Sequence, residues 1–186
     1  MKLNKFNQLF ALISLFAAAA CTGDKQPNNQ ENAIGFSEIK QYYQKPLIEM
    51  NRDMIAVQDE MIQGYISRHK WEMEQTGSGL YYQIYQEGKG ENPGDGSRVE
   101  FAYTMWLLDG TLLYTSDSTG NREILIGHNN DEAGIDEGLR LMKPGAKARF
   151  ILHPHLAFGV PGDGYKVPYR AILVYDIELI SIKNEI

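Results

Sequence analysis

Few groups of residues in this sequence combine the types and the spacing that catalysis or metal binding requires. His153–His155 places two imidazoles close together, but a zinc site needs further ligands, and no acidic partner lies nearby in the sequence. Ser116–Ser118 lacks a placed histidine and the sharp turn that presents a nucleophilic serine. Asn130–Glu132 has calcium-binding residue types without the spacing of an EF-hand loop. We therefore expect no metal site, no bound cofactor and no serine hydrolase.

Cys21 is the only cysteine of the chain, and its position indicates a covalent role. It follows a basic start and an uncharged run from Leu9 to Ala20, which is shorter than the roughly twenty apolar residues that span a bilayer. The run has the dimensions of a signal-peptide core and ends in alanines, with Ala18–Ala20 directly before Cys21. This pattern resembles a bacterial lipobox. Residues 1–20 are therefore interpreted as a lipoprotein signal peptide, and Cys21 as the lipid attachment site.

The charge balance restricts the possible partners. The chain of 186 residues has 24 acidic and 18 basic side chains, and its net charge is −6 at pH 7. Without residues 1–20, which contain two lysines and no acid, the net charge becomes −8. Nucleic-acid binding needs a basic surface, so we expect no nucleic-acid partner. We expect a protein of the cell envelope, held to a membrane by lipid and facing the periplasm, with the outer membrane favoured.

Residues 34–76 are expected to form a helical arm, after a polar, flexible tether at residues 21–33. Apolar residues recur along the arm every three or four positions, in two adjoining stripes. The first stripe contains Leu47, Met50, Met54, Val57 and Met61, and the second contains Ile48, Ile55, Ile62, Ile66 and His69. Pro46 is expected to start a new helix or to kink the existing one.

Such a wide apolar face must be covered by something. The favoured cover is the chain's own downstream domain. Two alternatives remain open. One is a homodimer through residues 36–74, and the other is a methionine-rich surface that accepts varied apolar clients, because thioether side chains repack easily.

Residues 77–186 have the pattern of a β-rich domain. Alternating or β-branched segments bounded by turn residues predict strands at Leu80–Gln86, Val99–Leu107, Thr111–Thr115, Glu123–Ile126, Ala148–His153 and Ala171–Ile182. Between them, Ile135, Leu139 and Met142 have helical spacing, and Pro144 and Gly145 end that helix. We predict an α+β fold, in which a curved antiparallel sheet of five to six strands wraps around one short helix.

Five ordered blocks of this domain resemble the FK506-binding (FKBP) family of peptidyl-prolyl isomerases. The blocks are Gly79–Tyr82 with Glu87–Gly90, Val99–Thr104 with Leu108–Gly110, Gly134–Leu139 with Met142–Gly145, Leu156–Gly159, and Leu173–Leu179. The resemblance covers residues 78–182. The lipobox and the arm are similar to membrane-anchored bacterial members, including macrophage-infectivity-potentiator-like and gliding-motility-associated lipoproteins.

The resemblance implies a cup that shelters a proline while its peptide bond rotates. By position within the blocks, it implies that the catalytic residues are Tyr103, Phe158 and Tyr175 and that the substrate pocket includes Leu113, Tyr114, Ile135 and Val167. Tyr103 would be a wall ring, Ile135 the floor and Tyr175 the rear. The glycine-containing loop 159–164 would overhang the cup as a flap.

Several of these positions depart from the family pattern. Tyr114 stands where the family carries an aspartate, and Arg122 stands at an aromatic position. Asp131 and Glu132 replace an apolar pair that lines the cup. Because an ionised carboxylate in a dry cavity is costly, we expect these two acids to point to solvent, or the cup to be wet.

Two functional classes follow. The first is an exported FKBP-type isomerase of weak turnover, which assists the folding of envelope proteins by acting on prolyl-containing peptide or unfolded segments. The second is a noncatalytic FKBP-like chaperone or interaction module, anchored to the membrane, which holds such segments without rotating them.

Overall fold

The computed structural model describes residues 36–128 and 132–184, with side chains placed for residues 48–128 and 132–183. The expected signal peptide (1–20), the attachment site Cys21 and the tether (21–33) lie outside the described residues, as does Asp131. Residues 49–186 form one unit of mutual contacts, which contains the whole sheet.

Most helices and strands lie where the apolar periodicities of the sequence predict them. The helical segments are α1 (Phe36–His69), α2 (Ser116–Thr119), α3 (Ala133–Arg140) and the 3-10 turn η1 (Pro154–Leu156). The strands are β1 (Glu74–Gln75), β2 (Tyr81–Gln86), β3 (Ser97–Leu107), β4 (Leu112–Thr115), β5 (Arg122–Leu125), β6 (Lys147–Leu152) and β7 (Leu173–Asn184).

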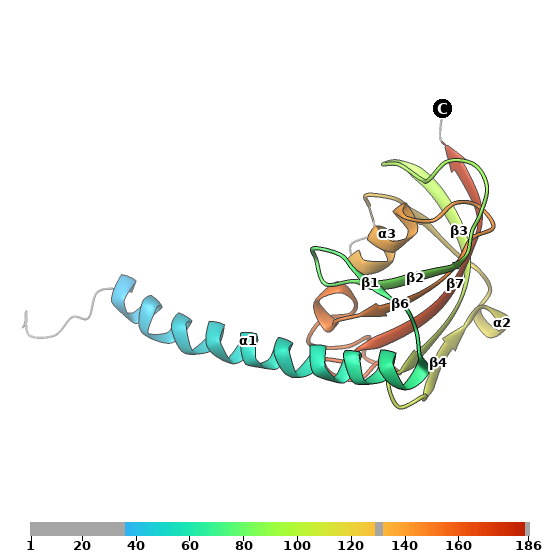
Figure 1. Ribbon diagram of the computed structural model, residues 1–186. Helices are drawn as coiled ribbons and strands as arrows, with labels where there is room; N and C mark the ends of the chain where they lie inside the picture. The colour runs from blue at the N-terminus through green and yellow to red at the C-terminus, as the bar shows by residue number, and fades with distance from the viewer. Residues whose placement is uncertain (1–35, 129–131, 185–186) are drawn as a thin grey trace, which may run out of the picture. The chain divides into compact units, whose positions relative to one another are not determined.

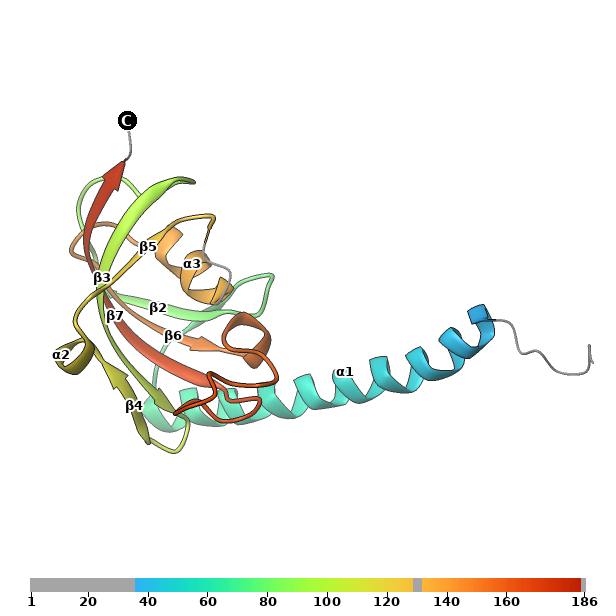
Figure 2. The same ribbon diagram turned by 180° about the vertical axis from the view of Figure 1, so that it is seen from behind.

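One antiparallel sheet contains all of these strands. Its order is β1-β2-β6-β7-β3-β4, and β5 pairs with β3 beside this path. The two longest strands, β3 and β7, pair along their full lengths, from Ser97 opposite Asn184 to Leu107 opposite Leu173. The sheet is strongly curved, and α3 lies inside the curve in both views (Figures 1 and 2). The concave face of the sheet is therefore the face that surrounds a helix.

Alternation along β3 builds the core on the concave face. Val99, Phe101, Tyr103 and Met105 are buried at every second position, as the period of two predicts. The helix α3 comes very close to the sheet at Gly138, where an added Cβ atom would lie 2.4 Å from the ring of Phe150 on β6. A side chain at position 138 would clash with Phe150. The glycine therefore lets α3 lie this close to the sheet.

The opposite face of the same strands packs against the second half of α1. Ile151 of β6 and Val174 of β7 share a buried cluster with Ile62 and Tyr65 of α1. The Tyr65 hydroxyl also accepts a hydrogen bond of 3.1 Å from the indole N–H of Trp106 on β3. Part of the second apolar stripe is thus covered by the chain's own domain, which confirms the favoured expectation for that stripe.

The first stripe has a different environment. Met50, Val57 and Met61 are 52%, 56% and 52% exposed, and Met54 is half-buried. These side chains project from a helix whose neighbouring face, at Ile62, already contacts the sheet. Met50, Val57 and Met61 of the first stripe are therefore available for contact with another molecule.

The structure confirms the predicted fold class, with two differences of detail. Within the described residues the sheet has seven strands instead of five or six, because Glu74 and Gln75 pair with Tyr82 and Tyr81 at the end of the expected arm. These two residues have no apolar alternation, so the pairing leaves no pattern in the sequence. In addition, α1 is a single helix through Pro46, so the new helix start considered at that residue is wrong.

Candidate functional site

A hollow of about 260 Å³ opens at one end of the concave face. It is lined by Tyr103 and Met105 of β3, Tyr114 of β4, Arg122 of β5, Glu132 just before α3, and Phe158 and Asp163 of the segment that follows η1. Strand alternation turns the β3 residues inward, while Glu132, Phe158 and Asp163 line other sides. The hollow, called the cup below, combines aromatic walls with charged side chains.

A buried carboxylate lies at the base of the cup. Glu132 is only 1% exposed, and it accepts a hydrogen bond from the hydroxyl of Tyr175, which is fully buried. Its second oxygen lies 2.6 Å from Nη1 of Arg122. A buried ion pair needs such additional hydrogen bonds to offset the loss of hydration. The expectation that Glu132 points to solvent is therefore wrong, because Arg122 and Tyr175 satisfy its charge inside the protein.

The same cluster changes the proton affinities of its members. Burial, followed by the charge of Glu132, raises the pKa of Tyr175 far above its ordinary value. Burial, the largest single effect, would lower the pKa of Arg122, but the charge of Glu132, the hydrogen bond to it and the neighbouring tyrosines together raise that pKa. At neutral pH Tyr175 therefore keeps its proton as a donor, and Arg122 stays cationic.

Asp163 ties the loop above the cup to the strand below it. One of its oxygens accepts hydrogen bonds from the backbone N–H groups of Tyr165, Lys166 and Val167, at 2.7–2.9 Å. The other accepts the hydroxyl proton of Tyr114. This bond raises the pKa of Tyr114 to about 12. Although burial alone would raise the pKa of Asp163, these hydrogen bonds together lower it.

The predicted site residues fall into two groups. Tyr103, Tyr114 and Phe158 line the cup directly. The other predicted residues belong to the buried core beside it, namely Leu113, Ile135, Val167 and Tyr175. Tyr175 reaches the cup through its bond to Glu132. The roles assigned to all seven residues stay predictions.

Sequence reasoning did not place Met105, Arg122, Glu132 or Asp163 in the site. Arg122 and Glu132 were visible as departures from the family pattern, and this was the available signal for both. Met105 belongs to the inward alternation of β3 and could have been included on that ground. For Asp163 the sequence offers only a turn-forming aspartate between glycines, so its bond to Tyr114 could not be anticipated.

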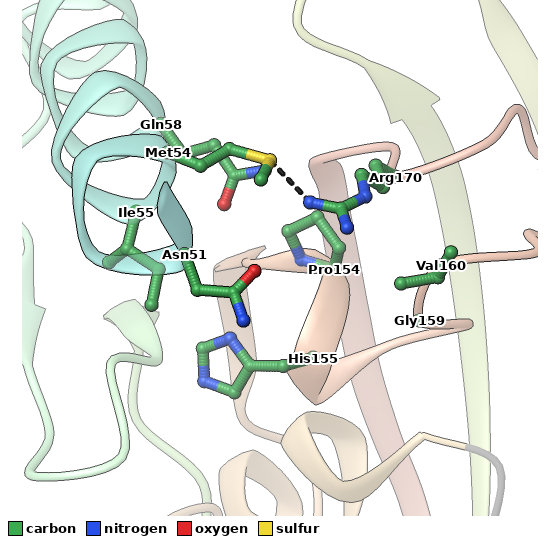
Figure 3. A pocket seen from close by; sticks show the side chains of 9 residues that line it. All are labelled: Asn51, Met54, Ile55, Gln58, Pro154, His155, Gly159, Val160 and Arg170. Atoms are coloured by element: carbon green, nitrogen blue, oxygen red, sulfur yellow. Dashed lines mark hydrogen bonds between the residues drawn. The ribbon is translucent and has the colours of Figure 1, made fainter. Parts of the chain in front are cut away.

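A second hollow of about 360 Å³ lies on the other side of the same loop. Its walls are Asn51, Met54, Ile55 and Gln58 of α1, with Pro154, His155, Gly159, Val160 and Arg170 (Figure 3). The Met54 sulfur accepts a hydrogen bond from the Arg170 guanidinium across it. This second hollow is called the groove below. Gly159 and Val160 line the groove and directly follow Phe158, which lines the cup, so the two sites are adjacent along the chain.

The two histidines have different partners, and only His153 bonds a side chain of α1. His153 is buried, and its Nε2 lies 3.0 Å from Oδ1 of Asp59, which also accepts the hydroxyl of Tyr81. Nε2 of His155 lies 3.1 Å from the carbonyl oxygen of Ser78. In the part of the chain that the structure describes, no three His, Cys, Asp or Glu residues are grouped as a metal site would require.

Within residues 36–128 and 132–184, no helix has both the length and the apolar character that crossing a bilayer requires.

Comparison with known families agrees with the resemblance to FKBP-type isomerases seen in the sequence. A family described as FKBP-type peptidyl-prolyl cis-trans isomerase, an isomerase family, matches residues 89–180 of this chain. This match covers the cup and α3.

Individual relatives extend the comparison. The isomerase FkpA of Aeromonas hydrophila is 37% identical over 112 residues, which cover 60% of this chain and 41% of that protein. The probable FkpA of Neisseria meningitidis is 34% identical over 107 residues, 58% of this chain and 39% of that protein. The chain thus spans less than half the length of these curated relatives. The crystal structure of FkpA from Escherichia coli matches 99% of this chain and 84% of that one, with a TM-score of 0.61 and 26% identity.

Tyr175→Phe tests whether the buried hydroxyl supports Glu132. The variant removes a donor from a buried carboxylate and should lower the free energy of unfolding by about 1–3 kcal/mol. Tyr82→Phe is the matched control, because its hydroxyl donates to Glu74 at 2.7 Å on the exposed side of the protein. The control should change stability by at most about 0.5 kcal/mol. Urea denaturation at pH 7 measures both, and equal losses would contradict the role of Tyr175.

Proposed function

We propose that the protein is a peptidyl-prolyl cis-trans isomerase that assists the folding of exported envelope proteins. The observation that carries this proposal is an aromatic-walled cup within a domain that matches the FKBP-type family. Its substrates would be prolyl-containing peptides and unfolded segments, which the names of the related proteins also suggest.

The chemistry of the reaction suits such a cup. Rotation about an X–Pro bond has a barrier of about 18–20 kcal/mol, because amide resonance is lost at the midpoint. The twisted amide is less dipolar than the planar one, so walls such as Tyr103, Met105 and Phe158 favour it relative to water. In the proposal, Tyr103 and Phe158 contact the prolyl segment, and Tyr175 supports the base of the cup. Leu113, Ile135 and Val167 hold the surrounding walls, while Tyr114 anchors the loop.

A proline-limited refolding assay tests the activity. The protein at micromolar concentration should accelerate the slow refolding phase, in proportion to its concentration and below the amount of substrate. Phe158→Ala removes a wall of the cup and should reduce the acceleration about tenfold or more. Ile180→Ala is the control, since it removes an exposed apolar side chain on β7. A refolding rate equal to the uncatalysed rate would refute the isomerase proposal.

A noncatalytic binding module is the second candidate. The charged pair of Arg122 and Glu132 in the cup favours it, as does the groove beside the cup, where Ile55 and Val160 are exposed. In the same refolding assay, such a module would raise the yield of folded substrate without changing the rate. The two outcomes separate the candidates.

We further propose that Cys21 is acylated and holds the protein to a membrane, facing the periplasm, with the outer membrane favoured. The sequence pattern of residues 1–21 supports this anchor. Each buried lipid CH₂ contributes about 0.8 kcal/mol, so several chains would hold the domain firmly.

The anchor predicts a definite chemical change. Mass spectrometry of the mature protein should find an N-terminus at Cys21 with acyl chains attached, and fractionation should recover the protein with membranes. Cys21→Ser removes the acylated sulfur and should abolish the added mass. A mature N-terminus downstream of Cys21, or an unmodified thiol, would contradict the anchor.

Finally, we propose that two copies pair through residues 36–74. The first stripe supports this partner, because its exposed members Met50, Val57 and Met61 recur at the spacing of an apolar helix seam.

Light scattering tests the pairing directly. The unaltered protein should have twice the mass of one chain, and Met50→Lys with Met61→Lys should reduce it to that of one chain, since charges would enter the seam. Ala56→Lys with Ser67→Lys is the matched control, because both residues are exposed and lie away from the stripe. A single-chain mass for the unaltered protein would rule the pairing out.

A further inference from the structure

Arg122 occupies an unusual place for a cation. It begins β5, lines the cup, and its side chain is 28% exposed. Its guanidinium carbon lies 5.5 Å from the centroid of the Phe101 ring and 5.5 Å from that of Tyr103. Contacts with ring faces at this distance favour a cation. The guanidinium is therefore held against the aromatic wall that a bound proline would touch.

Glu132 fixes the orientation of this guanidinium. The pair is joined at 2.6 Å through Nη1, and the carboxylate is itself held by Tyr175. A guanidinium is planar and carries five N–H groups. When Glu132 holds one of its nitrogens, the directions of the remaining N–H groups are fixed as well. Both side chains line the cup, but Glu132 is almost fully buried, so Arg122 is the more accessible member of the pair.

The other polar side chains around the cup already use their protons. The hydroxyl of Tyr114 donates to Asp163, and that of Tyr175 donates to Glu132. The hydroxyl of Thr119 donates to the carbonyl oxygen of Thr115, so in its 3.3 Å contact with the hydroxyl of Tyr103 the tyrosine is the donor. Phe158 has no polar atom. Among the described residues that line the cup, Arg122 is thus the one with N–H groups beyond those its recorded partner needs.

Rotation of the prolyl bond creates a hydrogen-bond acceptor on the substrate that the planar amide lacks. In the planar amide, the nitrogen lone pair is delocalised into the carbonyl group and accepts no hydrogen bond. As the bond twists, the lone pair localises on the prolyl nitrogen, which becomes an acceptor. A donor to this nitrogen stabilises the twisted state alone, whereas a donor to the carbonyl oxygen would also stabilise the planar state.

We propose that Arg122 is a catalytic residue that donates a hydrogen bond to the prolyl nitrogen of the rotating bond, and that Glu132 and Tyr175 position it. This inference rests on the proposed isomerase function. Where the family pattern has an aromatic residue in the wall of the cup, this protein then has Arg122 as a positioned hydrogen-bond donor.

The test separates catalysis from binding. A prolyl tetrapeptide serves as the probe, with kcat/KM measured for its isomerisation and Kd measured for the same peptide by calorimetry. Arg122→Met should lower kcat/KM by about tenfold to a hundredfold, because it removes a charged donor used only in the twisted state. The Kd should change by less than about threefold. Arg98→Met, at an exposed arginine paired with Glu123, is the control and should leave both values unchanged.

A double-mutant cycle tests the positioning role. If Glu132 acts through Arg122, Glu132→Gln should lower kcat/KM in the presence of Arg122 and have no further effect in Arg122→Met. Arg122→Met alone leaves Glu132 buried without this partner and could unfold the protein. The double variant removes that carboxylate charge as well, so its kcat/KM still tests the role of Arg122. Thermal unfolding identifies any unfolded variant.

Each outcome has a distinct meaning. An active unaltered protein whose kcat/KM survives Arg122→Met, or the double variant, overturns the role of Arg122 and leaves the isomerase function standing. Equal changes in kcat/KM and Kd also overturn it, because Arg122 would then only bind. Additive losses in the cycle overturn the positioning role of Glu132. An inactive unaltered protein refutes the isomerase function and this inference together.

Discussion

The burial of one carboxylate governs the architecture around the cup. Glu132 is removed from water, and an isolated buried charge would cost several kcal/mol. Two of its partners come from different strands, Arg122 from β5 and Tyr175 from β7. Glu132, the residue directly before α3, is therefore held to both strands. Loss of either partner would leave a buried charge less well compensated.

This constraint depends on the packing of the sheet behind it. Tyr175 and Phe150 point to the concave face, while their neighbours Val174 and Ile151 point to the face that receives α1. The two cores are thus built from alternate residues of the same strands. At Gly138 the absence of a side chain lets α3 lie directly on Phe150, and this contact places Glu132 at the depth where its partners can reach it.

The cup differs from a purely apolar pocket in a chemically specific way. Its aromatic walls suit a prolyl ring, and its charges are compensated within the protein, by Arg122 for Glu132 and by Tyr114 and backbone N–H groups for Asp163. Compensated charges disturb an apolar ligand less than free ones do. From the sequence, the departures at Tyr114, Arg122 and Glu132 suggested weak turnover. In the structure they form a different lining of the cup, in which each charge has partners within the protein.

The sequence by itself determined the fold class, because the alternation in Val99–Leu107, the β-prone run near the C-terminus and the spacing of Ile135 and Leu139 are local patterns. It also located Tyr103, Tyr114 and Phe158, through blocks that resemble a known family. Only the tertiary structure decided the position of Glu132. Local sequence cannot show whether a charge is buried, since that depends on partners such as Tyr175, 43 positions away along the chain. The short strand β1 was missed for the same reason, because its pairing depends on a neighbouring strand and leaves no periodic signal.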